Sequence, residues 1–165
     1  MIIFIAALGE NNEMGYKGHL PWRDARMEND TKRLHRLTNK NIIVMGEKTY
    51  HDYKNVQEAF HTKQVYVISR STNSLPDANV LNDINDVATL AKSKELWVIG
   101  GGSIFKQLLP NAGKMFLTIV NHEFTADTFF PKYKTNEWDI TSKQDFPADS
   151  SNPYSYTFLE LCRKN

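Results

Sequence analysis

The sequence predicts an α/β protein built on one mixed sheet that is mostly parallel. Three observations lead to this class. Short runs rich in Ile and Val alternate with amphipathic helical patterns in the first two thirds of the chain, as in βαβ units covered on both faces. The last third is strand-like with no strong helix between its segments, which favours an antiparallel edge. The length of 165 residues fits one ordinary domain, so we expect 1–165 to fold as a single domain.

Each expected element rests on hydrophobic spacing and on the glycine or polar residues that follow it. The expected buried strands are residues 2–8, 41–45, 64–69 and 96–99. The expected helices are residues 26–37, 84–92 and 103–109. The strand-like segments of the last third are residues 114–121, 138–143 and 154–163. The polar residues 71–79 are expected to form a long loop.

Charge and composition exclude several classes of partner. Apolar residues make up 41% and charged residues 24% of the chain, the balance of a soluble globular protein. The formal net charge of +1 creates no field that would gather nucleic acid or acidic lipid. The bases Lys32, Arg33 and Arg36 are interpreted as a solvated helix face. We therefore expect no nucleic-acid partner and no membrane partner.

Cysteine and histidine usage predicts a cytoplasmic protein without a metal site. The lone Cys162 excludes an internal disulfide and favours a reducing compartment. The apolar start "MIIFIAALG" is too short to span a membrane and lacks a preceding basic region, so it is interpreted as a buried strand. The five histidines show no metal-ligand spacing.

Two strand-to-helix turns carry glycine where a ligand backbone contact is expected. The segment "LWVIGGGSIF" places Gly100 to Gly102 between a buried strand and a helix, and "IIVMGEKTY" places Gly46 before another helix start. Glycine permits close approach, and the free N–H groups of a first helical turn favour an anion such as a pyrophosphate. The spacing is not the G-x-G-x-x-G fingerprint of dinucleotide folds, and a tight turn without a ligand would need the same glycines.

The order of several motifs resembles the dihydrofolate reductase family across almost the whole chain. The matching blocks are "IAAL" at 5–8, "MGYKGHLPW" at 14–22, "MGEKTY" at 45–50, "VIGGGSIF" at 98–105 and "ADTFFP" at 126–131. The resemblance implies a single-domain sheet of about eight strands with an antiparallel C-terminal edge and about four helices. It also implies NADPH as the hydride donor, 7,8-dihydrofolate as the substrate and antifolates as inhibitors. A monomer is the simplest expectation.

Reduction of the pterin C6=N5 bond needs a proton on a weakly basic nitrogen, so the family chemistry requires an acid that points inward. The candidates are Asp24, Glu28 and Asp30. On a helix, Asp30 shares a face with Met27, Leu34 and Leu37, whereas Glu28 lies roughly 160° away. Asp30 is the predicted catalytic acid, although capping or decoration of a helix start is the alternative for any Asp in a first turn.

The family pattern supports Asp30 by its distance from the residues that follow it, but not by its distance from the residues that precede it. Thr38 follows Asp30 by eight residues, as the resemblance requires. Bacterial relatives place the acid five residues after the Trp of "LPW" and vertebrate relatives six after it, and these offsets from Trp22 give Met27 and Glu28. We infer an insertion of about three residues before the helix, and Glu28 remains the second candidate.

The resemblance also assigns the rest of the site. Trp22 is expected to hold a water beside the acid, Thr118 to hydrogen-bond the acid, and Leu20 to pack where the hydride moves, at the end of a mobile loop from Met14. The predicted substrate contacts are Ile5, Ala6, Ala7, Thr31, Leu34, His35, Lys63, Ile99 and Phe105. The predicted cofactor contacts are Ala7, Met14, Gly15, Leu20, Gly46, Lys48, Thr49, Ser69, Arg70, Ile99, Gly101, Gly102, Ser103, Ile104, Phe105 and Thr128.

Two departures from the family bear on ligand choice. Glu47 stands where a base usually approaches the 2′-phosphate of the cofactor, next to the matching Ser69 and Arg70. A carboxylate would repel a dianion unless it turns to solvent, so we predict a weakened preference for NADPH over NADH, with Lys48 and Arg70 as possible compensation.

The second departure concerns the folate tail. Lys63 takes the place of the Arg in "LPGR", and lysine cannot form the two-bond fork that arginine offers a carboxylate. His35 could reach the same carboxylate, although a solvent-facing ring is the plainer interpretation. Either folate is held less tightly or the natural substrate lacks the glutamate tail.

Two alternative functions stay open at this stage. One is a reductase of the same fold that acts on another pterin or on a ribosylaminopyrimidine, which the altered "LPGR" region favours. The other is a non-catalytic nucleotide-binding paralogue, for which Glu47 and the displaced acid would be signs of decay.

Overall fold

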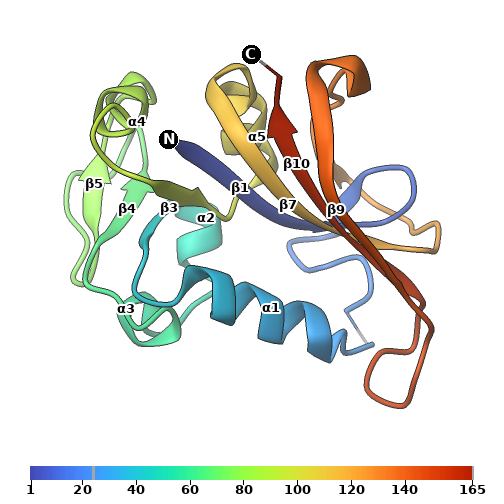
Figure 1. Ribbon diagram of the computed structural model, residues 1–165. Helices are drawn as coiled ribbons and strands as arrows, with labels where there is room; N and C mark the ends of the chain where they lie inside the picture. The colour runs from blue at the N-terminus through green and yellow to red at the C-terminus, as the bar shows by residue number, and fades with distance from the viewer. Residues whose placement is uncertain (24, 165) are drawn as a thin grey trace.

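An eight-stranded sheet organises the protein in a computed structural model, which describes residues 1–23 and 25–164. The strand order is β5-β4-β3-β6-β1-β7-β10-β9. Pairing is parallel from β5 to β7, whereas β10 runs antiparallel to both β7 and β9. The predicted mixed sheet with an antiparallel C-terminal edge is confirmed (Figure 1).

The bounds of the elements follow the chain order. The strands of the large sheet are β1 Ile2–Leu8, β3 Ile42–Gly46, β4 Val65–Ile68, β5 Asn79–Leu81, β6 Leu96–Val98, β7 Ala112–Val120, β9 Trp138–Phe146 and β10 Tyr156–Arg163. A small second sheet pairs β2 Glu13–Gly15 with β8 Thr128–Phe129. The helices are α1 Glu28–Thr38, α2 Glu47–Tyr50, α3 Val56–Ala59, α4 Asn85–Leu90 and α5 Gly102–Leu108, with 3-10 turns at Leu109–Asn111 and Thr135–Glu137.

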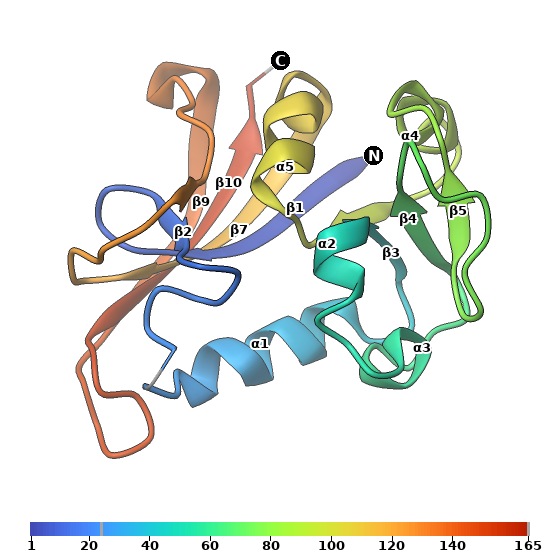
Figure 2. The ribbon, with the colours of Figure 1, turned by 180° about the vertical axis from the view of Figure 1, so that it is seen from behind.

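Alternation along β1 divides the core into two layers. Ile2 and Phe4 join the cluster that packs against α4 and α5, while Ile3 and Ile5 join the cluster under α1 and α3. Successive side chains of a strand point to opposite faces, so a strand that is apolar on both faces must be covered on both. Figures 1 and 2 show helices on both sides of the sheet, with α2 beside the start of α5.

The described residues form five α-helices, in agreement with the expected number of about four, and two of them, α2 and α3, are short. Two expectations about local structure are wrong. Residues 71–79 do not form only a loop, because Asn79 begins β5, an edge strand of three residues that is too short to show alternation. Arg33 belongs to no solvated face, because its side chain is 4% exposed under the sheet. Its hydrogen bonds to β7 and β10 outweigh the preference of charge for water.

The start of α1 is fixed by a segment far away in the chain. Met27 precedes the helix without any side-chain cap, and the Glu28 and Asn29 amides instead donate to the Ser151 carbonyl and the Asn152 side-chain oxygen, at 3.2 and 2.9 Å. Orphan amides at a helix start need such acceptors. These two amides therefore do not need the Asp30 side chain as a cap. No described helix is long and apolar enough to cross a membrane.

Asp77 connects the end of α2 to the start of α3. Its carboxylate accepts hydrogen bonds from the Tyr50 hydroxyl at 2.5 Å and from the Val56 amide at 3.1 Å, and its carbonyl accepts one from Gln57 at 2.8 Å. The bond to Asp77 raises the pKa of Tyr50 to about 12. Asp77 thus supports the segment that carries residues 47–49.

We predict that Asp77→Ala lowers the free energy of unfolding by about 1–3 kcal/mol, because two donors lose their acceptor. Urea denaturation of the variant beside Asp86→Ala, a change of an exposed Asp, measures the effect. Equal midpoints for Asp77→Ala and the control would contradict the prediction.

Candidate active site

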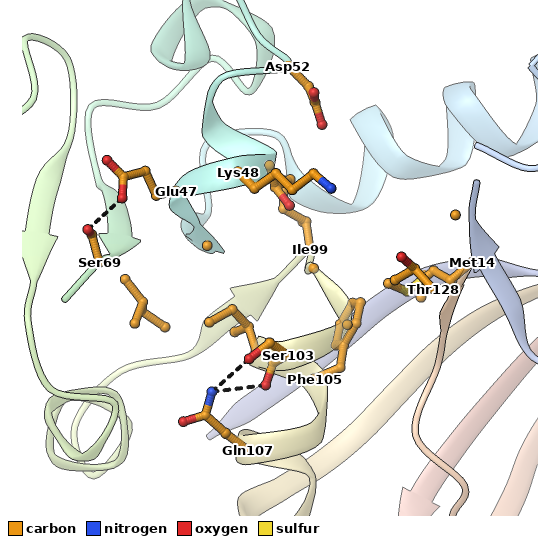
Figure 3. A pocket seen from close by; sticks show the side chains of 18 of the residues that line it. Met14, Glu47, Lys48, Asp52, Ser69, Ile99, Ser103, Phe105, Gln107 and Thr128 are labelled. Carbon is orange, nitrogen blue, oxygen red and sulfur yellow. Dashed lines mark hydrogen bonds between the residues drawn. The ribbon is translucent and has the colours of Figure 1, made fainter. Parts of the chain in front are cut away.

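A cleft of about 1280 Å³ opens where the carboxyl ends of parallel strands meet the starts of α2 and α5. Its other walls come from α1 and from residues 14–20. Open α/β sheets place their ligands at this edge. Figure 3 shows Glu47 and Ser69 facing each other at one end of the cleft, with Met14 and Thr128 at the other.

Most residues assigned from the sequence line this cleft. They are Ile5, Ala6, Ala7, Met14, Gly15, Leu20, Asp30, Leu34, Gly46, Lys48, Thr49, Ser69, Arg70, Ile99, Gly101, Gly102, Ser103, Ile104, Phe105 and Thr128. So many of them line it because the glycine turns and the strand ends that carry them lie at the same edge of the sheet.

The remaining assigned residues lie elsewhere. Trp22 and Thr31 line an adjoining cavity of about 260 Å³ that also reaches Asp30. Thr118 is buried behind the acid. His35 is exposed and contacts the Ala59 carbonyl at 3.1 Å, and the exposed Lys63 borders neither cavity. The structure thus does not bring His35 or Lys63 to the cleft.

Asp30 lies on the inward face of α1, as the spacing with Met27 and Leu34 predicts. Met27 is buried and Leu34 lines the cleft beside the acid. Burial raises the pKa of the Asp30 carboxyl, although a hydrogen bond from the Thr118 hydroxyl and the charge of Arg33 oppose the rise. A carboxylate in this state holds a proton, or a cationic partner, more readily than one in water.

The two glycine turns pack against each other. Gly100 has φ of +121°, and a Cβ there would come within 3.2 Å of the Phe105 ring. A Cβ on Gly46 would come within 3.0 Å of Ile104, and the Gly46 amide donates to the Gly100 carbonyl at 2.8 Å. Side chains at these positions would push α5 away from β3. The glycines therefore fix the separation of the helix starts that border the cleft.

The Glu47 carboxylate points toward the end of β4, with 27% of its side chain exposed. It accepts hydrogen bonds from the Ser69 hydroxyl at 2.6 Å and from the Thr72 hydroxyl, and His51 lies 3.9 Å away. The Ser69 bond, followed by that of Thr72, lowers the pKa of the Glu47 carboxyl. The Ser69 hydroxyl, which lines this end of the cleft, is thus already bound to a carboxylate.

Sequence reasoning missed Asp52 and Tyr53, which line the cleft just after α2. Burial, then the charges of Asp52 and Asp30, raises the pKa of Tyr53 to about 12. It also missed residues 82–84, which line the opposite end. Recognition of α2 and β5 as elements would have placed both groups at strand or helix ends, but neither element is long enough for periodicity to reveal.

The described residues contain no group of three or more His, Cys, Asp or Glu side chains that could hold a metal ion. The cleft brings together one partly enclosed acid, an apolar wall and two helix starts without side-chain caps. This arrangement suits proton delivery beside a bound dinucleotide.

The family model for dihydrofolate reductase matches residues 1–163. The chain belongs to the dihydrofolate reductase family. A dihydrofolate reductase of Bacillus subtilis is 30% identical over all of this chain and 96% of its own length. One of Staphylococcus aureus is 27% identical over 92% of this chain and 91% of its own length. The resemblance drawn from the motifs is confirmed.

The fold comparison agrees with the family assignment. A dihydrofolate reductase from Enterococcus faecalis complexed with NADP(H) and RAB-propyl superposes with a TM-score of 0.84 at 22% identity, over all of this chain and 97% of that one. The family sheet is thus preserved despite an inferred insertion before α1.

The raised pKa of Asp30 predicts a pH-dependent loss of stability. The folded protein binds this proton more tightly than the unfolded chain does, so stability falls as pH rises from about 4 through the folded pKa. Asp30→Asn removes that loss. We expect the melting temperature of Asp30→Asn, relative to the original protein, to be higher at pH 8 than at pH 4.

Differential scanning fluorimetry at both pH values tests this expectation. Asp86→Asn, on the exposed side of α4, is the matched control and should show no such pH dependence. The expectation would be contradicted if the difference in melting temperature between Asp30→Asn and the original protein were the same at pH 4 and pH 8.

Proposed function

We propose that the protein reduces 7,8-dihydrofolate to 5,6,7,8-tetrahydrofolate with NADPH, by hydride transfer to C6 and protonation of N5. One observation carries the proposal: the inward carboxylate of Asp30 lines the same cleft as the two glycine turns. A family chain with this acid in place has the group that the reaction needs. We also propose that it acts as a single-domain, cytoplasmic monomer, in keeping with its one large sheet and its lone Cys162.

The residues present fit both ligands. The free amides that follow Gly46 and Gly101 would hold the pyrophosphate, and Ile99 and Phe105 would border the nicotinamide. Bound NADPH supplies the hydride. Asp30 would hydrogen-bond the pterin ring and favour its protonated form, while Leu20 and Met14 would keep bulk water from the reacting face.

Steady-state absorbance at 340 nm with NADPH and dihydrofolate tests the function. Loss of absorbance that methotrexate blocks supports it. Oxidation of NADPH only with a pterin that lacks the glutamate tail would favour the alternative reductase, for which Asp52 in the cleft and Lys63 outside it are the specific observations. Binding of NADPH without turnover on any acceptor would contradict both.

We predict that Asp30→Asn lowers turnover at pH 7 by about 10²- to 10⁴-fold, because the amide cannot stabilise a protonated pterin. Turnover should recover in part at acid pH, where solvent protonates the substrate. The matched control is Glu28→Gln, since Glu28 pairs with Lys32 at 3.1 Å on the outer face of α1. Retention of full turnover by Asp30→Asn, or its loss in Glu28→Gln, would exclude the assigned role.

The position of Glu47 predicts a weakened preference for the phosphorylated cofactor. Its carboxylate binds the Ser69 and Thr72 hydroxyls that a 2′-phosphate would need, which leaves Arg70 as the lining cation next to Ser69. Lys48 points away from Glu47 (Figure 3), and its charge acts on Asp127, beside Thr128 at the other end of the cleft. Acids in dinucleotide sites more often accept from a ribose hydroxyl. We expect the ratio of kcat/KM for NADPH over NADH to stay below about a thousandfold.

Glu47→Gln should raise that ratio because it removes like-charge repulsion. Glu58→Gln, an exposed change in α3, is the control and should leave the ratio unchanged. A ratio above about a thousandfold in the unmodified protein, or no rise in Glu47→Gln, would contradict the prediction.

A further inference from the structure

Arg33 is a buried cation placed directly behind the proposed active site. Its side chain is 4% exposed, and its guanidinium donates to the Leu117 carbonyl at 3.0 Å and to the Glu160 carboxylate at 3.4 Å. The Phe158 and Phe116 ring centroids lie 4.4 and 5.7 Å from it. These contacts hold the guanidinium between α1, β7 and β10.

Packing alone does not explain a charge in this place. An apolar side chain of similar size would fill the space between the two Phe rings, and replacement of a buried ion pair by apolar groups is often neutral or stabilising. Glu160 offsets the charge only in part, since its side chain is 37% exposed and its oxygen is 3.4 Å away. The charge calls for a role other than stability.

The hydrogen-bond chain connects Arg33 to the acid. Arg33 lies one helical turn after Asp30, and it also donates to the Thr118 hydroxyl oxygen at 3.5 Å. A hydroxyl has a single hydrogen, so an oxygen that accepts from Arg33 directs that hydrogen elsewhere. The Thr118 hydroxyl lies close enough to the Asp30 carboxyl to lower its pKa, so a hydrogen directed that way would meet the acid.

We propose that Arg33 is a positioning residue for proton delivery: its guanidinium orients the Thr118 hydroxyl toward Asp30 and places a buried positive charge behind the carboxylate, which Glu160 partly offsets from the other side. The proposal deepens the proposed reductase function and rests on it. It makes the Arg33–Glu160 pair a determinant of the pH at which the enzyme loses activity.

The charged and titratable groups that act on the acid or on its neighbours come from α1, from β10 and from the residues after α2. Arg33 and Arg36 belong to α1, Glu160 to β10, and Asp52 and Tyr53 follow α2. Of these, Arg33 is the cation whose charge opposes the burial-driven rise in the pKa of Asp30. Loss of its charge should let the site hold its proton to higher pH, and loss of the charge of Glu160 should do the reverse.

The test follows the pH profile of hydride transfer in single-turnover experiments on the full chain. Arg33→Met should move the midpoint upward by about half a pH unit or more, Glu160→Gln should move it downward, and Arg33→Lys, which keeps the charge, should remain near the original. Opposite shifts from two partners of one contact are not expected of a merely structural pair. Lys32→Met, which removes an exposed charge from the outer face of the same helix, is the matched control and should not shift the profile.

Carbon-13 NMR titration of the Asp30 carboxyl in ligand-free protein gives a second measurement that does not depend on turnover. The titration midpoint should move upward in Arg33→Met and downward in Glu160→Gln, as in the activity profile. Turnover with unshifted midpoints in Arg33→Met and Glu160→Gln, or shifts of both in one direction, would overturn the proposal while leaving the reductase function intact.

Absence of turnover with dihydrofolate would contradict the proposed function, and NMR shifts as expected would then support the electrostatic link between Arg33 and Asp30 alone. If Arg33→Met fails to fold, Glu160→Gln decides the matter, because Glu160 is partly exposed and its replacement disturbs little packing. An unshifted midpoint in that variant would count against the proposal.

Discussion

The site depends on one electrostatic constraint. A carboxylate must lie against a sheet that excludes water, and no direct ion pair may neutralise that carboxylate. The docking of α1 across β7 meets this constraint. It buries Met27, brings Asp30 to the Thr118 hydroxyl and places Arg33 behind them, one turn further along the helix. The acid thereby receives one hydrogen bond and a nearby but indirect positive charge, while its outer side remains open to the cleft.

Simple periodicities predicted the mixed α/β sheet and the inward position of Asp30, whereas the proposed catalytic role of Asp30 came from the family resemblance. Ile and Val runs identify the parallel strands, and spacing with Met27 and Leu34 identifies Asp30 as the inward acid of three candidates. Arg33 was interpreted as a surface base because of its charge, since charged residues are rarely buried, although it lies only three residues after Asp30 on the same helix. Its burial depends on Glu160 and the Leu117 carbonyl, which are partners 127 and 84 residues away that no local pattern reveals.

The two ends of the cleft differ in how far the sequence could describe them. Glu47 was recognisable as a departure, yet its direction was not, because the bonds with Ser69 and Thr72 form only when β3 and β4 pair. Asp52 and Tyr53 follow a helix of four residues, below the length at which amphipathic spacing can be judged. Short elements position side chains as firmly as long ones but leave almost no signal in the sequence.

The capping of α1 by the 149–152 segment has a consequence for the nascent chain. The acceptor of the Asn29 amide, the Asn152 side chain, lies 123 positions later in the chain. The residues of α1 therefore leave the ribosome well before the acceptor of their first turn is synthesised. During that interval α1 would fray at the end that carries the acid, because short helices in water are marginal on their own. Translation past the β9–β10 hairpin, rather than formation of the parallel strands, would be the step that makes the enzyme competent.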